Sequence, residues 1–178
     1  MNRRLVFAFP GRLETKTGGY AYDRHLIREL TDLGWSVEPI SIGEGFPDPT
    51  PAVLAEAERQ LSTLADGDLV LIDGLAFGVM PDWAAQEAKR LRLVALVHHP
   101  LGLETGVSTE QKQRLLASET RALSAARHVF VTSDATARQV ASLLDVPSAK
   151  ITAALPGTEP GDIASSGKAE PHILSVGS

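Results

Sequence analysis

The sequence has no cysteine, few aromatic residues and no long apolar run. The absence of cysteine among the 178 residues excludes disulfides, thiolate metal sites and cysteine nucleophiles, and it fits a reducing cytoplasm. No apolar run approaches the roughly 20 residues that a membrane-spanning helix needs. The first apolar run is short and ends at Pro10, so we expect neither a signal peptide nor a transmembrane segment. We therefore expect a cytoplasmic protein.

An excess of basic residues is also lacking. The chain has 17 Lys and Arg against 22 Asp and Glu, which gives a net charge of −5. Proteins that bind mainly to nucleic-acid backbones rely on clustered Lys and Arg, so we expect no nucleic-acid partner. Hydrophobic residues make up 43% of the chain, which is enough to bury one substantial core.

The common cofactor and catalytic motifs are missing too. The loop at 10–19 lacks the G-x-G-x-x-G of dinucleotide folds and the Lys-Ser/Thr that completes a P-loop. The sequence shows no nucleophile elbow, no Ser-His-Asp order and no metal-binding signature. These absences disfavour NAD, ATP and hydrolase chemistry, and we expect no cofactor and no bound metal.

What the chain does contain is an alternation of short apolar runs and amphipathic segments. The runs are continuous and rich in Val, Ile and Leu, which is typical of strands buried on both faces of a parallel sheet. They lie at 5–9, 37–42, 69–72, 93–97, 129–132, 151–155 and 173–176. Helical patterns lie at about 18–33, 50–65, 81–90, 108–126 and 133–144, with predicted N-caps at Thr17, Thr50, Ser108 and Ser133. This alternation predicts an α/β fold with a doubly wound, mostly parallel, Rossmann-like sheet.

In such folds ligands bind beyond the carboxyl ends of the strands. The loops that follow the predicted strands lie at 10–19, 73–78 and 98–106, and a turn follows at Ser133. Candidate site residues therefore come from these four places.

Gly18 and Gly19 stand between the first strand and the first helix. Glycines there allow a positive φ and remove the Cβ atoms that would keep a ligand from the free N–H groups of the helix. A phosphate or a sugar hydroxyl could then approach the main chain. The alternative interpretation is that the pair only relieves a tight turn.

His98 and His99 follow the fourth strand. Neighbouring side chains of an extended segment point to opposite sides, so we expect one imidazole to face the crevice and the pair not to chelate one metal. That imidazole can hydrogen-bond a sugar hydroxyl or act as an acid or base. The alternative is a histidine satisfied by a backbone carbonyl. Glu104 and Asp73 could accept hydrogen bonds from sugar hydroxyls, although an isolated surface carboxylate is usually only solvated.

Ser133 and Arg138 lie at the start of the last predicted helix. Capping alone accounts for Ser133, and Arg138 is expected at the surface. A ligand contact, to a phosphate in the case of Arg138, is the alternative role.

The end of the sequence has a different composition. Residues 156–171 are dense in Gly, Pro, Ser and charge, which is typical of a linker, and a short strand pattern follows. We therefore expect a Rossmann-like domain at 1–155, an interdomain linker at 156–171 and the first strand of a further domain at 172–178.

Several short phrases occur in order along nearly the whole chain. They are T-G-G-Y at 17–20, V-H-H-P at 97–100, V-F-V-T-S-D at 129–134, V-P-S-A-K-I at 146–151, P-G-T-E at 156–159 and I-L-S-V-G-S at 173–178. Together they resemble the N-terminal half of the GT-B nucleotide-sugar glycosyltransferases, specifically the retaining group called glycosyltransferase family 4, or group 1.

In that family two Rossmann-like domains face each other across a cleft. The resemblance implies that 1–155 is the acceptor-side domain, that Gly18 and Gly19 lie near the donor diphosphate, and that His98 is the catalytic histidine of the cleft. His99 stands where many relatives carry Asp. The candidate acceptor or sugar contacts are Thr17, Tyr20, His99, Glu104 and Asp73. The family's paired glutamates and the basic residues that grip the diphosphate belong to the second domain.

The resemblance implies that the full-length enzyme moves a sugar from a nucleotide-diphosphate donor to the hydroxyl of an acceptor sugar, lipid or small molecule. Transfer would retain the anomeric configuration without an obligatory metal, and 1–178 alone would be inactive because half of the cleft is missing. Two alternatives stay open. One is a non-catalytic Rossmann-like module that binds a small sugar or anion, and the other is a GT-B epimerase or phosphorylase.

Overall fold

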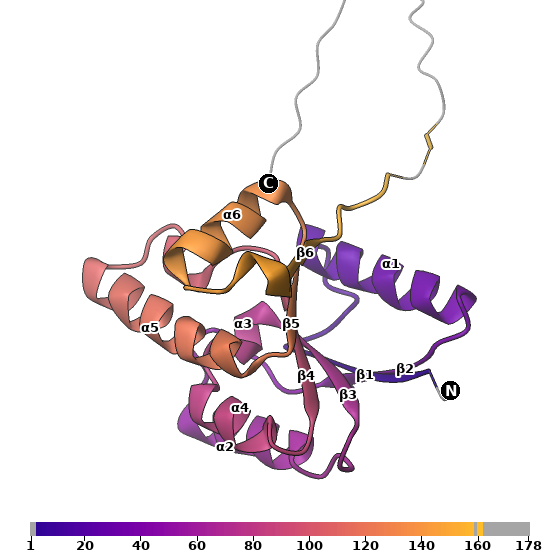
Figure 1. Ribbon diagram of the computed structural model, residues 1–178, viewed down its shortest axis with the longest axis horizontal. Helices are drawn as coiled ribbons and strands as arrows, with labels where there is room; N and C mark the ends of the chain where they lie inside the picture. The colour runs from indigo at the N-terminus through magenta and orange to yellow at the C-terminus, as the bar shows by residue number, and fades with distance from the viewer. Residues whose placement is uncertain (1–2, 159, 162–178) are drawn as a thin grey trace, which may run out of the picture.

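The computed structural model describes residues 3–158 and 160–161, which form one parallel sheet with helices on both of its faces (Figure 1). The strands of these residues are β1 (Arg4–Phe9), β2 (Ser36–Ser41), β3 (Leu69–Asp73), β4 (Arg92–Val97), β5 (His128–Val131) and β6 (Ile151–Ala153). They pair in the order β2-β1-β3-β4-β5-β6, and every pair is parallel. The predicted Rossmann-like α/β fold is confirmed.

The described helices are α1 (Gly18–Asp32), α2 (Pro51–Leu61), α3 (Gly74–Phe77), α4 (Pro81–Glu87), α5 (Thr109–Ala125) and α6 (Asp134–Leu143), with the 3-10 turns η1 (Leu101–Leu103) and η2 (Ser148–Lys150). Four of the described helices, α1, α2, α5 and α6, begin directly after the predicted N-caps. In each of these caps the side-chain hydroxyl accepts a hydrogen bond from the backbone N–H three residues further on. The four capping residues are Thr17, Thr50, Ser108 and Ser133. None of the described helices is long and apolar enough to cross a membrane.

The loop predicted after β3 is instead the short helix α3. The side chain of Asp73 accepts the N–H of Leu75 at 2.7 Å, and this cap starts the helix directly at the end of the strand. The predicted helix at 50–65 ends earlier, at Leu61, and the last described strand ends at Ala153 instead of at 155. The strand predicted at 173–176 and residues 162–171 of the predicted linker lie outside the described residues.

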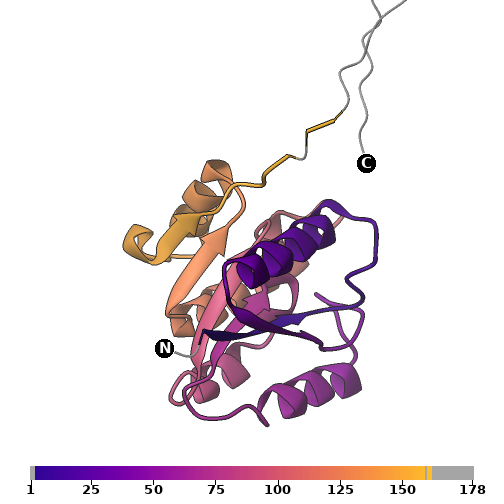
Figure 2. The ribbon, with the colours of Figure 1, turned by 90° about the vertical axis from the view of Figure 1, so that its right-hand side faces the viewer.

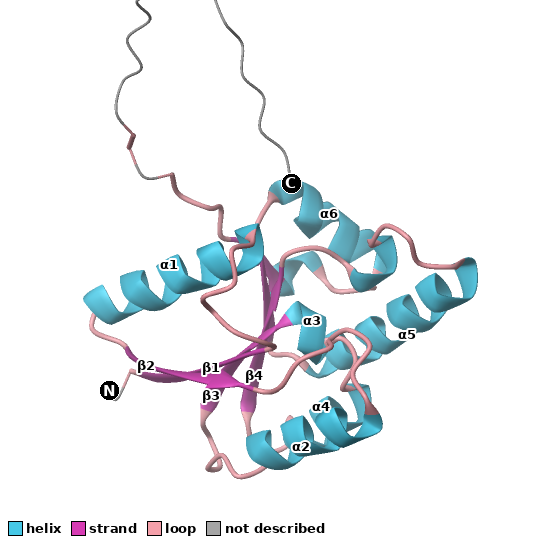
Figure 3. Ribbon diagram, turned by 180° about the vertical axis from the view of Figure 1, so that it is seen from behind, coloured by secondary structure: helices cyan, strands magenta, loops and turns pink. Residues whose placement is uncertain are grey.

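The direction of the chain connections reverses at β1. The chain moves from β1 outward to β2, and then crosses back over β1 to β3 and continues to β6. Because crossovers of parallel strands are right-handed, the two directions put their helices on opposite faces of the sheet. Figure 3 shows α1 on one face, and α2 and α4 on the other. Figure 2 shows the same separation, with the indigo α1 above the sheet and the purple α2 below it.

Two apolar cores follow from this arrangement, because successive side chains of a strand point to opposite faces. Leu5, Phe7 and Phe9 of β1 face α1, where Leu26 and Leu30 pack against them. The alternate residues of the same strand contribute to the larger core, which α2, α4, α5 and α6 cover. The face of α1 that carries Leu26 and Leu30 therefore packs on the sheet, whereas Leu33, which follows the helix, is exposed.

Helix α5 supports the segment that follows β4. Glu119 of α5 is 1% exposed, and its Oε2 accepts the N–H of Leu101 at 2.9 Å, whereas its Oε1 has no hydrogen bond among the described residues. Burial outweighs that hydrogen bond and raises the pKa of Glu119 from its ordinary value of 4.5 to about 7. Gly102 lies against the same helix, where a Cβ would overlap the Leu116 side chain and stand 3.1 Å from the Lys112 carbonyl oxygen.

Replacing Gly102 with Ala is expected to lower the free energy of unfolding by about 1–3 kcal/mol, because the new methyl group forces η1 away from α5. Urea unfolding measures the difference. The matched control is Gly18→Ala, since no heavy atom lies within 4 Å of the Cβ position there, and its stability should stay close to that of the parent. Equal stability of both variants would contradict the close packing of η1.

Replacing Glu119 with Gln is expected to remove a pH dependence of stability. The folded state holds the Glu119 proton more tightly than the unfolded chain, so ionisation of this group costs stability as the pH rises from 4.5 to about 7. The stability advantage of Glu119→Gln over the parent should grow across that interval, by at most about 3 kcal/mol. Urea unfolding at several pH values tests this, with Glu110→Gln, an exposed residue of α5, as the control. An advantage that does not change with pH would refute the assignment.

Candidate functional site

The polar side chains of the site gather where β1, β3 and β4 end. In open α/β sheets the crevice for a ligand forms where the connections diverge, and here they diverge on either side of β1. Asp73, the last residue of β3, pairs in register with Leu96 of β4. His98 is two residues beyond Leu96, so it lies at the same edge of the sheet. The loop that leaves β1 reaches this edge as well and leads into α1.

Asp23, His98 and Asp73 form a buried ionic cluster at this edge. The Nε2 atom of His98 lies 3.2 Å from Oδ1 of Asp23 and 3.8 Å from Oδ2 of Asp73. Asp23 is completely buried and Asp73 is 2% exposed, whereas the side chain of His98 keeps 24% of its surface exposed. Three elements, α1, β3 and the end of β4, thus contribute one ionisable group each.

Asp23 is a site residue that the motifs did not predict. It lies on the same face of α1 as Leu26, Ile27 and Leu30, because residues three, four and seven positions apart share a helix face. A carboxylate on a stripe that packs against a sheet is rare unless it has a partner. That single charged residue on an otherwise apolar stripe was the signal available in the sequence.

The cluster raises the pKa of both His98 and Asp73. Burial alone would lower the pKa of His98, but the hydrogen bond to Asp23 and the negative charges of Asp73 and Asp23 outweigh burial and raise it. Burial, and after it the charge of Asp23, raises the pKa of Asp73 to about 6. The two carboxylates therefore favour the positively charged form of the His98 imidazole.

The same three residues could in principle hold a metal ion. Each offers one ligand atom, and these atoms lie within 4.8 Å of one another, which is the spacing of a cation site. The direct hydrogen bond between Asp23 and His98, however, gives each side chain a partner within the protein. We therefore treat the cluster as an ionic network, and the expectation of no bound metal stays a prediction.

The ring of His98 is held by its neighbours as well as by its hydrogen bond. The ring of Tyr22 meets it edge-on, with centroids 5.4 Å apart and planes at 86°. On another side it lies against Gly19, where a Cβ would stand 3.8 Å from two atoms of the ring. His98 therefore lies beside the T-G-G-Y phrase, from which it is almost 80 residues apart in the sequence.

Gly18 and Gly19 do not act through a positive φ, and that part of the sequence interpretation is wrong. The two residues are the first of α1, and neither is among the glycines with positive φ. The unusual backbone conformation belongs to Gly11 instead, at φ 67°, where a Cβ would also collide with the Tyr20 hydroxyl. What Gly19 provides is the absence of a side chain beside His98.

A cavity of about 650 Å³ opens beside this cluster. It brings together most of the predicted site residues, namely Thr17, Gly19, Tyr20, Asp73, His98, His99 and Glu104. Pro47, Leu75 and Val107 supply an apolar part of its wall. Neither Lys nor Arg is among the described residues that line it. The cavity is therefore acidic and apolar, with imidazoles at its edge.

Both histidines line this cavity, although only one was expected to face the crevice. The chain bends at residues 98 and 99 instead of continuing as an extended strand, so the alternation of sides does not apply. His99 and Glu104 are exposed. The backbone oxygen of His98 is within 3.5 Å of the hydroxyls of Thr132 and Thr136, which come from the end of β5 and from α6.

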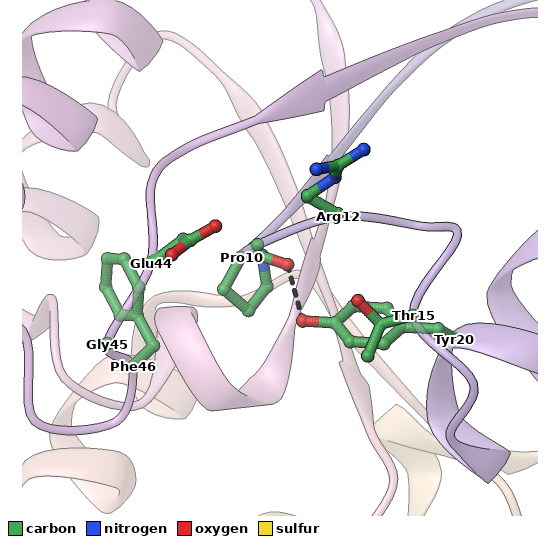
Figure 4. A pocket seen from close by; sticks show the side chains of 8 residues that line it. Pro10, Arg12, Thr15, Tyr20, Glu44, Gly45 and Phe46 are labelled. Carbon is green, nitrogen blue, oxygen red and sulfur yellow. Dashed lines mark hydrogen bonds between the residues drawn. The ribbon is translucent and has the colours of Figure 1, made fainter.

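A smaller hollow of about 310 Å³ lies on the other side of Tyr20, which lines both spaces. Figure 4 shows Glu44 and Phe46 on one side of it, and Arg12 and Thr15 on the other. The hydroxyl of Tyr20 donates a hydrogen bond to the carbonyl oxygen of Pro10 at 2.7 Å. The hydroxyl therefore holds the loop after β1, while the ring separates the two spaces.

Three predicted site residues do not line the main cavity. Gly18 borders a separate hollow between α1 and the residues after β6. Ser133 caps α6 through the N–H of Thr136, as the capping interpretation predicts, and Arg138 is exposed on that helix. Contact of these three residues with a ligand stays a prediction.

Comparison with known families identifies the domain family of the chain. The chain has no significant match among curated proteins. A family model described as Glycosyl transferase 4-like domain matches residues 43–157, which is more than half of the chain and includes β3, β4, Asp73 and both cavity histidines. The chain therefore belongs to the glycosyltransferase 4-like domain family, as its sequence phrases predict.

Proposed function

We propose that this chain is the acceptor-side domain of a retaining glycosyltransferase of GT-B architecture that uses a nucleotide-diphosphate sugar as donor. The observation that carries the proposal is the contact between His98 and the start of α1 at the sheet edge where ligands of this fold class bind. A sugar in the 650 Å³ cavity would have the imidazole on one side and the free N–H groups of a helix on the other.

In the proposed reaction the domain positions the groups that react. The first N–H groups of α1, beside Gly18 and Gly19, would offset part of the diphosphate charge, and His98 would hydrogen-bond an oxygen of the transferred sugar. Much of the rate enhancement in such transfers comes from holding donor and acceptor together. The paired glutamates and most donor contacts would come from a second domain after the linker at 156–171, so 1–178 alone would be inactive.

The composition of the cavity favours one class of acceptor. Asp73 and Glu104 line the space, the described lining has no Lys or Arg, and apolar side chains cover another part of it. Carboxylates repel phosphate and attract ammonium groups, while the apolar wall fits the C–H face of a sugar ring. We infer that the acceptor is a hydroxyl compound that is uncharged or carries an amine.

Turnover tests the proposed function directly. Residues 1–178 alone, and the same residues fused to a family 4 donor-binding domain, are assayed against a panel of nucleotide-diphosphate sugars. We expect turnover only from the fusion, and His98→Ala should lower it by about 100-fold. His128→Ala is the matched control, because His128 lies at the opposite end of a strand and contacts Thr152.

Turnover by 1–178 alone would contradict the proposed inactivity of the isolated domain. Tight binding of a free sugar by 1–178, with no transfer by the fusion, would instead favour the alternative of a binding module. If His128→Ala lowered the activity as much as His98→Ala, the proposed role of His98 at the transferred sugar would be contradicted.

Acceptor charge is a second test. Methyl glucosaminide should bind to 1–178 about tenfold more tightly than glucose 6-phosphate, because the cavity carboxylates act on opposite charges. Chemical-shift titration by NMR measures both affinities. Glu104→Gln should reduce the difference, and Glu56→Gln on α2, paired with Arg59, should not. Tighter binding of the phosphate would contradict this acceptor class.

A further inference from the structure

Asp23 is the most deeply buried charge of the site. It is completely buried, its Oδ1 contacts His98 and its Oδ2 has no hydrogen bond among the described residues. Burying a carboxylate costs several kcal/mol unless a close partner compensates it. No part of Asp23 is accessible to a ligand, so whatever it does at the site it does through His98.

The contact fixes which nitrogen of His98 can meet a ligand. Nε2 is the atom that faces Asp23, at 3.2 Å, and Asp73 is also nearest to Nε2. A carboxylate only accepts hydrogen bonds, so Nε2 must carry a proton to make this contact. Nδ1 makes no hydrogen bond to the described residues, and His98 lines the cavity, so Nδ1 is the ring nitrogen whose hydrogen-bonding position is unused.

The ring cannot easily exchange the two nitrogens by rotation. Tyr22 packs edge-on against one side of it, and Gly19 lies against its Nε2 and Cδ2 atoms. A flipped ring would leave the buried carboxylate of Asp23 without its partner, which costs more than the loss of an exposed hydrogen bond.

We propose that Asp23 is a positioning residue: it accepts the Nε2–H of His98, holds the ring in one orientation and leaves Nδ1 for a hydrogen bond with the bound sugar. The role in sugar transfer rests on the proposed function, but the Asp23–His98 contact does not.

A consequence is that His98 acts as a hydrogen-bond donor. The titratable groups packed around the ring are Asp23 and Tyr22 of α1, Asp73 of β3 and the neighbouring His99, and the two carboxylates favour the charged imidazole. The raised pKa of His98 widens the pH range over which Nδ1 also carries a proton and donates to a sugar oxygen. A neutral ring with its proton on Nε2 would instead accept there.

The tautomer of His98 tests the proposal in the unmodified chain. Long-range proton–nitrogen NMR spectra of uniformly labelled 1–178, recorded above the pKa of His98, distinguish Nε2–H from Nδ1–H. We expect the Nε2–H form. Observation of the Nδ1–H form would overturn the proposal, and this measurement does not depend on the folding of any variant.

Asp23→Asn tests the effect of the charge. Asparagine keeps an acceptor at the same place but removes the negative charge, so the pKa of His98 should fall by about 1 in the NMR titration. The matched control is Asp32→Asn, an exposed carboxylate at the end of the same helix, which should leave the pKa unchanged. A folded Asp23→Asn with an unchanged His98 titration would overturn the proposal.

The transferase fusion separates this proposal from the proposed function. If it is active, Asp23→Asn should lower kcat more than it raises KM and should move the alkaline limb of the pH profile to lower pH, whereas Asp32→Asn should do neither. If the fusion is inactive in every form, the proposed function fails, and the tautomer and titration results still decide the role of Asp23.

Discussion

The connections of the sheet reverse their direction at β1, and the placement of every site residue depends on that reversal. It separates the loop after β1 from the loop after β3 and opens a space between them. It also puts α1 on its own face of the sheet, since right-handed crossovers in opposite directions cannot share a face. The start of α1 consequently lies beside the end of β4, and Gly19 lies next to the ring of His98.

The ionic cluster at this edge joins the fold to the site. Asp23 stands on the packing surface of α1, Asp73 both ends β3 and caps α3, and both carboxylates approach Nε2 of His98. Removing one partner of such a cluster leaves an uncompensated buried charge, which is more costly than removing a surface pair. The groups that shape the chemistry of His98 therefore also hold α1 in its position relative to the sheet.

Local patterns in the sequence were sufficient to predict the architecture. Continuous Val, Ile and Leu runs marked the described strands, and caps such as Thr17 and Ser108 marked the starts of helices, because these features depend only on near neighbours. The grouping of Thr17, Gly19, Asp73 and His98 in one cavity followed from the rule that ligands bind at the carboxyl ends of strands.

What the sequence could not provide were contacts between distant segments and the local course of the backbone. The partner of Asp23 is 75 residues away, so only the misplaced charge on an apolar stripe indicated its role. The cap that Asp73 makes for α3 replaced a predicted loop, and the bend at His98 brought both histidines into the cavity. The glycine pair was found by its position, but its effect lies in the missing side chain of Gly19 and not in a positive φ.

The central claim is that one edge of this domain forms a wall of a sugar-transfer cleft, with the start of α1 and His98 side by side. The most direct measurement is an NMR titration of labelled 1–178 with a nucleotide-diphosphate sugar, followed through the backbone amides and the histidine rings. The account predicts that the signals that move most are those of Gly18, Gly19 and His98. Shifts confined to other parts of the chain, such as α6 around Arg138 or the far ends of the strands, would contradict it.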